Sequence, residues 1–134
     1  MKAFEFCCPT KIIAGAHALD KLPDEVADRG MKHPLVMTDA GLVKLGVAAK
    51  LTGVLDAADV PYEVFDQVPP DSSMDVVNEV ARLYAARGCD GFVAIGGGSV
   101  IDTTKGAAAS LACEGVDFAT LQGSEILHAD LPPF

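Results

Sequence analysis

The chain has few basic residues, no long apolar run and no cysteines at C-x-x-C spacing, and each shortage argues against a class of protein. Its 10 Lys and Arg are set against 19 Asp and Glu, which gives a formal net charge of −9. Nucleic acids and anionic membranes bind clustered cationic side chains, so we expect neither as a partner. No apolar run approaches the ~18 residues that span a bilayer, and the first residues lack the apolar stretch of a signal peptide. These shortages favour a soluble, cytoplasmic protein.

Residues that could bind a metal are few and scattered along the chain. The 4 cysteines contain no C-x-x-C pair, and the 3 histidines are isolated from one another. Cys7 and Cys8 are adjacent, so in a strand they would point to opposite faces. We therefore expect reduced, mostly buried thiols, with no metal site and no catalytic residue in this chain.

Hydrophobic residues make up 50% of the 134 residues, which is enough for one domain with a real core. Compact apolar runs that predict strands alternate with apolar residues at helical spacing. We predict strands over 34–39, 62–66 and 91–96, and helices over 19–30, 47–58, 77–88 and 99–112. Two extended segments, 3–8 and 11–15, precede this alternation and are typical of a β-hairpin. Short connections between alternating strands and helices predict an α/β domain over residues 1–134, a doubly wound, mainly parallel sheet with flanking helices.

Two features follow predicted strands, where ligands bind in sheets of this kind. Asp39 ends one strand, and the glycines Gly96–Gly98 end another just before a helix. Glycine lets the backbone approach a ligand closely, and a helix start offers unpaired N–H groups for an anion. Ser99 adds a hydroxyl. The glycine turn is therefore predicted to hold a phosphate or pyrophosphate.

The same residues allow other interpretations. A P-loop is excluded because Lys105 precedes Gly106, and the G-x-G-x-x-G fingerprint is incomplete because Ile101 stands at its third glycine. Ser99 and Asp102 have capping-box spacing, and Asp102 could pair with Lys105. Asp39 has the sequence context of a helix N-cap. Helix capping and ligand binding therefore both remain open for Ser99 and for Asp39.

The stretch "GGGSVIDTTKG", residues 96–106, resembles the G-G-G-S-x-x-D-x-x-K signature of iron-containing (group III) alcohol dehydrogenases. The likeness extends over nearly the whole chain, including the proline turn "VPPDSS" at 68–73. It implies a Rossmann-like fold of the dehydroquinate synthase-like N-terminal type, with NAD as cofactor in preference to NADP. It also implies that Asp39 contacts the adenosine ribose and that Asp71 lies near the adenine. The residues implied at the pyrophosphate are Gly96, Gly97, Gly98, Ser99, Val100, Ile101 and Asp102.

The resemblance also implies an activity for the complete enzyme, the transfer of a hydride between an alcohol or aldehyde and the nicotinamide. Family members hold Fe²⁺ or Zn²⁺ in a second, helical domain, which we expect to be absent from this chain, so the chain alone should be inactive. We expect a homodimer or higher homo-oligomer, assembled through the N-terminal segments. Two alternatives stay open, a stand-alone nucleotide-binding module without catalysis and a fragment of a glycerol dehydrogenase-like polyol oxidoreductase.

Overall fold

The computed structural model describes residues 10–121 and 129–134. The element order is η1 (Ala18–Lys21), α1 (Leu22–Asp28), β1 (Leu35–Met37), α2 (Ala40–Lys44), α3 (Val47–Ala57), β2 (Glu63–Phe65), α4 (Met74–Arg87), β3 (Phe92–Ala94), α5 (Gly98–Ala112) and η2 (Phe118–Thr120). The predicted alternation of strands and helices is confirmed.

The strands form one parallel sheet in the order β2-β1-β3, with β1 in the centre. Val36 of β1 is in register with Val64 on one side and Val93 on the other. The chain moves one way from β1 to β2 and returns the other way from β2 to β3. Because such crossovers are right-handed, α3 and α4 cover opposite faces of the sheet.

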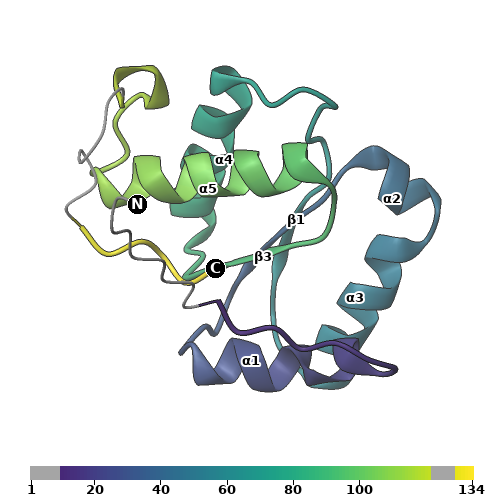
Figure 1. Cartoon of the computed structure of the whole chain (residues 1–134). Helices are drawn as coiled ribbons and strands as arrows, with labels where there is room; N and C mark the ends of the chain where they lie inside the picture. The colour runs from purple at the N-terminus through teal and green to yellow at the C-terminus, as the bar shows by residue number, and fades with distance from the viewer. Residues whose placement is uncertain (1–9, 122–128) are drawn as a thin grey trace, which may run out of the picture.

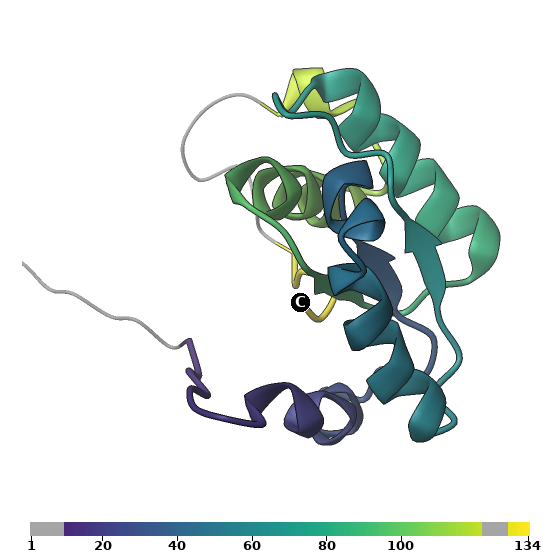
Figure 2. The ribbon, with the colours of Figure 1, turned by 90° about the vertical axis from the view of Figure 1, so that its right-hand side faces the viewer.

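Each face of the sheet has its own core, because successive strand residues point to opposite sides. Leu35 and Met37 pack with Phe92 and Val100 under α4 and α5. Val36 and Val93 pack on the other face, with Val26 of α1 and Leu51 and Leu55 of α3. Figures 1 and 2 show α4 and α5 lying together, with α1 at the opposite end of the molecule. Helices on both faces confirm the doubly wound α/β architecture.

The N-terminal part differs from the prediction. Residues 11–15, the expected second arm of a hairpin, form no strand, and the expected first arm, 3–8, lies outside the described residues. The helix predicted over 19–30 divides into η1 and α1, with a proline in the first turn of α1. The chain leaves α1 through Gly30, whose φ of 73° is the left-handed conformation that glycine tolerates.

The thiols in the described ranges are free, as expected. Cys89 is buried, and this burial raises the pKa of its thiol to about 11, while Cys113 is half-buried. Cys7 and Cys8 lie outside the described residues. Among the described helices, none is long and apolar enough to cross a membrane.

Asp90 joins the segments that lead into β1 and β3. Its Oδ2 accepts a hydrogen bond from the Lys32 N–H at 2.7 Å, and its Oδ1 accepts one from the His33 N–H at 2.9 Å. The Asp90 N–H in turn donates to the His33 carbonyl at 3.2 Å. One carboxylate therefore aligns the starts of two neighbouring strands, and with them the register of the sheet.

We predict that Asp90→Ala lowers the free energy of unfolding by about 2 kcal/mol, because backbone N–H groups lose a charged acceptor. Urea unfolding followed by circular dichroism measures the change. Asp28→Ala is the control, since Asp28 is an exposed aspartate at the end of α1. Equal stability of the two variants would show that Asp90 does not hold the strands in register.

Candidate ligand cleft

A cleft of about 450 Å³ opens at the carboxyl ends of β1 and β3. Parallel neighbouring strands end at the same edge of a sheet, so the turns that follow β1 and β3 lie side by side. The proline turn after β2 supplies the remaining wall. The cleft is lined by Asp39, Ala40, Gly41, Val68, Pro69, Pro70, Gly97, Gly98, Ser99 and Val100.

A second hollow, of about 310 Å³, lies between α4 and the C-terminal part of α5 and is lined in part by Asn78, Arg82 and Asp117. Its polar groups bond to one another, since the Asn78 side-chain amide donates to Asp117 Oδ1 at 2.7 Å. That hydrogen bond is the main cause of the lowered pKa of Asp117. These groups hold the chain around η2 in place, so this hollow offers a ligand fewer unpaired hydrogen-bonding groups than the cleft does.

The three consecutive glycines have different reasons to be glycine. A Cβ on Gly96 would lie 2.4 Å from Val100 Cγ2 and 2.6 Å from Val100 Cβ, so Gly96 is needed for packing inside the protein. A Cβ on Gly97 or Gly98 would meet no protein atom within 4 Å. The backbone of Gly97 is extended, with φ −84°, which any residue can adopt. The bare backbone at Gly97 and Gly98 therefore faces open space in the cleft.

The start of α5 presents hydrogen-bond donors to this space. Its N-cap, Gly97, has no side chain that could accept a hydrogen bond from the first turn. The first N–H with a partner inside the helix is that of Ile101, which donates to the Gly97 carbonyl at 3.2 Å. The N–H groups of Gly98, Ser99 and Val100 thus have no partner within the helix. Together with the positive end of a 15-residue helix, they form a site suited to an anion.

The helix start also corrects the predicted capping box. Ser99 lies inside α5, one residue beyond its start, so it does not cap the helix. In the part of the chain that the structure describes, no ion pair joins Asp102 to Lys105. The capping interpretation of the Ser99 and Asp102 spacing is wrong, because the helix begins at Gly98 rather than after Ser99.

Asp39 caps a helix and also lines the cleft. Its Oδ1 accepts from the Leu42 N–H at 3.0 Å, which confirms the N-cap interpretation. Gly41 leaves room for this carboxylate, because a Cβ on Gly41 would lie 2.9 Å from Asp39 Oδ1. Asp39 is partly exposed, and no residue of the described ranges bonds its Oδ2. One carboxylate oxygen therefore remains for a ligand.

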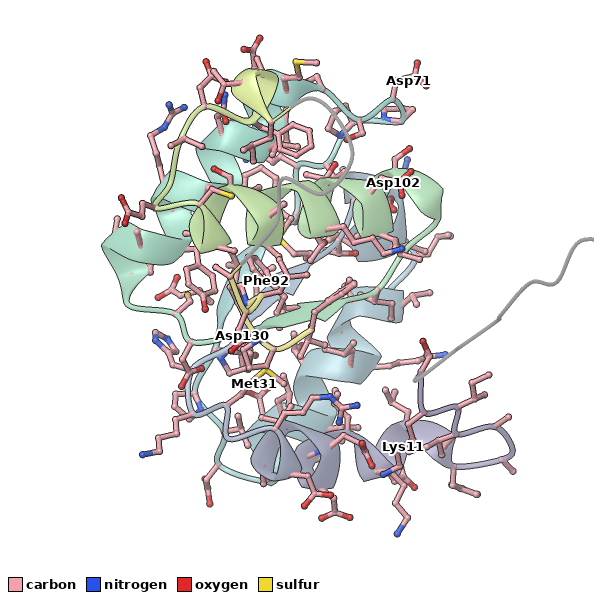
Figure 3. All side chains as sticks on the ribbon, turned by 60° about the vertical axis from the view of Figure 1, so that its left-hand side comes forward. Lys11, Met31, Asp71, Phe92, Asp102 and Asp130 are labelled. Atoms are coloured by element: carbon pink, nitrogen blue, oxygen red, sulfur yellow. The ribbon has the colours of Figure 1, made fainter. Side chains whose placement is uncertain are left out.

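The structure brings some of the predicted residues together and leaves others apart. Figure 3 shows Asp71 at the tip of the proline turn and Asp102 near the N-terminal end of α5. Both are exposed, as is Ile101, and none of the three lines the cleft. Gly96 is exposed as well and lies against the Val100 side chain instead of lining the cleft. The predicted residues that line it are Asp39, Gly97, Gly98, Ser99 and Val100.

Other lining residues were missed by sequence reasoning. Ala40 and Gly41 follow Asp39, and Val68, Pro69 and Pro70 begin the proline turn. Consecutive prolines shortly after a predicted strand were the available signal, because they mark the turn at the edge where ligands bind.

The described residues contain no group of three or more His, Cys, Asp or Glu that could hold a metal ion. The donor set that an iron or zinc centre requires is therefore not found in the parts of the chain that the structure covers.

The fold and the cleft define a parallel α/β domain in which unpaired N–H groups of a helix start lie at the carboxyl edge of the sheet. The family model for iron-containing alcohol dehydrogenases matches residues 9–133. The chain belongs to this family.

Relatives agree with this assignment. A choline dehydrogenase of Bacillus subtilis is 35% identical over 98% of this chain and 33% of its own length. A lactaldehyde reductase of Escherichia coli is 38% identical over 89% of this chain and 31% of its own length. The solved structure of the NADH-dependent butanol dehydrogenase A of Thermotoga maritima superposes with a TM-score of 0.88, at 27% identity, over 100% of this chain and 34% of that one. The chain thus spans about a third of the length of these relatives.

The contrast between the glycines predicts different costs for the same substitution. Gly96→Ala should lower the free energy of unfolding by about 2 kcal/mol, because the new methyl group overpacks Val100. Gly98→Ala, the matched control, should leave it within about 0.5 kcal/mol, because its methyl group enters open space. Urea unfolding of both variants checks this, and equal losses would contradict the assignment of Gly96 to packing and Gly98 to the cleft.

Proposed function

We propose that this chain is the dinucleotide-binding domain of a metal-dependent alcohol dehydrogenase and that its cleft binds NAD(H). The observation that carries the proposal is the open space at Gly97 and Gly98. The protein's own packing does not require glycine at either position. A ligand whose charged group must approach the backbone of α5 does require it.

The walls of the cleft suit the parts of a dinucleotide. The free N–H groups of Gly98, Ser99 and Val100 can donate to the pyrophosphate. The unbonded oxygen of Asp39 can accept from ribose hydroxyls, as an acidic residue at a strand end does in other dinucleotide sites. Val68, Pro69 and Pro70 offer an apolar surface against which a base can pack. The residues present therefore fit the cofactor.

The cofactor and the residues of this chain would have different roles in the reaction. When bound, the nicotinamide accepts or donates the hydride. The residues of this chain bind and orient the cofactor, and none of them is proposed to transfer a proton. We propose that the metal and the substrate are bound by a region that corresponds to the part of the relatives' length outside their match to this chain. The residues of this chain alone would then turn over no substrate. The relatives' names include choline, lactaldehyde and butanol, and we propose a small alcohol or aldehyde as substrate class.

Assembly into a homodimer remains part of the proposal. Ile12 and Ile13, in the N-terminal segment, are 81% and 42% exposed, and a partner copy would cover such apolar side chains.

Filling the open space should weaken NADH binding. Gly97→Val is expected to weaken NADH binding by more than about 10-fold, because its side chain occupies the position of the pyrophosphate. Titration followed by NADH fluorescence measures the affinity. Gly53→Val is the matched control, since a Cβ there also meets nothing within 4 Å but lies on α3, outside the cleft lining. Unchanged affinity in a folded Gly97→Val protein would refute this site.

Asp39 should set the preference between cofactors. We expect the chain to bind NADH at least about 10-fold more tightly than NADPH, because the Asp39 carboxylate repels a 2′-phosphate. Asp39→Asn removes the charge and keeps an oxygen to cap α2, so it should narrow the ratio without unfolding the domain. Paired titrations with NADH and NADPH test this. An unaltered ratio would mean that Asp39 lies away from the ribose.

A further inference from the structure

The proline turn, residues 68–73, is held across the cleft mainly by side chains. The Val68 N–H donates to the Thr38 carbonyl at 3.4 Å at one end, and the Ser73 carbonyl accepts from the Val77 N–H at 3.1 Å at the other. Between these points, no backbone–backbone hydrogen bond within the described ranges involves residues 69–72. Pro69 and Pro70 have no N–H to donate.

Two hydroxyl groups of α5 hold this part of the turn. The Ser99 hydroxyl donates to the Pro70 carbonyl. One helical turn further on, Thr103 Oγ1 lies 3.0 Å from Ser72 Oγ in a hydroxyl–hydroxyl hydrogen bond. Ser99 and Thr103 are four residues apart and so lie on one face of α5. Thr103 is 0% exposed and Ser72 is exposed, so the second hydrogen bond is shielded from water on the Thr103 side only.

This arrangement limits what the Ser99 side chain can do for a ligand. A serine hydroxyl has one hydrogen to donate. Here that hydrogen goes to Pro70, so only the lone pairs of Ser99 Oγ are left, and lone pairs do not attract a phosphate oxygen. The Ser99 N–H, at the start of the helix, is still free to donate.

We propose that Ser99 and Thr103 are positioning residues that clamp the proline turn to α5 and so set the width of the cleft on its base-binding side. The Ser99 hydroxyl acts on the ligand through Pro70 and does not donate to the pyrophosphate. The part of this inference that concerns ligand affinity rests on the proposed function, whereas the clamp itself does not.

Ligands with and without phosphate separate the two roles of Ser99. Ser99→Ala and Thr103→Val should weaken adenosine and ADP by the same factor, about 3- to 10-fold, as expected for the loss of one uncharged hydrogen bond. A phosphate-donating hydroxyl would instead give a loss for ADP and none for adenosine in Ser99→Ala. Amide NMR titrations measure both affinities.

Two further variants make the test specific. Thr104→Val is the matched control, because Thr104 is equally buried and its hydroxyl donates to Val100 O of the same helix at 2.7 Å. It should leave both affinities unchanged. Ser99→Thr retains the hydroxyl and should restore the wild-type values.

Hydrogen exchange of the free chain tests the clamp without any ligand. The amide of Val68, whose N–H donates to the Thr38 carbonyl where the turn begins, should exchange about 3- to 10-fold faster in Ser99→Ala and in Thr103→Val, but not in Thr104→Val. Unchanged exchange in the first two variants would overturn the clamp. If the wild-type chain bound neither ADP nor NADH while exchange behaved as expected, the proposed function would fail and the clamp would stand.

Discussion

The parallel pairing of β1 with β3 is the constraint on which the rest of the molecule depends. It places the carboxyl ends of two strands, distant in sequence, at one edge of the sheet, so the turn after Met37 faces the turn after Ala94. Asp90 fixes this register from the opposite end by accepting hydrogen bonds from Lys32 and His33. A shift of one residue would turn the buried side chains of β1 to the wrong face and separate Asp39 from the glycine turn.

The same edge shows how an acidic chain can attract an anionic ligand. The net charge is −9, and the lining of the cleft contains no Lys or Arg. For the anionic ligand that we propose, the attraction would therefore come from backbone groups. The start of α5 concentrates unpaired N–H groups and the positive end of the helix dipole at one place. Glycine at 97 and 98 lets a ligand reach them, and Gly96 lets Val100 pack underneath.

Much of this could be predicted from the sequence, because it depends on local patterns. The apolar runs at 34–39, 62–66 and 91–96 contain the three strands, and the helix predicted over 47–58 is observed as Val47–Ala57. The short helix α2 was missed because a segment as short as Ala40–Lys44 has too few turns to show a periodicity. The expected strand at 11–15 was wrong, because an extended apolar segment does not reveal whether a partner strand lies beside it.

The site was predicted in part, for a physical reason. Asp39 and the glycine turn follow strands, and in parallel α/β sheets ligands generally bind at the carboxyl ends of the strands. The wall formed by Val68–Pro70 depends on how the turn after β2 reaches α5, which strand order and side-chain bonds decide and a linear pattern does not. The capping interpretation of Ser99 was wrong because the helix starts at Gly98, and the Ser99 hydroxyl donates to Pro70 instead.

The central claim, that the start of α5 holds the pyrophosphate of a dinucleotide, is tested most directly by amide proton–nitrogen correlation spectra of the chain during titration with NADH. The account predicts that the signals of Gly98, Ser99 and Val100 shift most, together with those of Ala40 and Gly41 across the cleft. Shifts gathered instead around Asn78, Arg82 and Asp117, or no shifts at millimolar NADH, would contradict it.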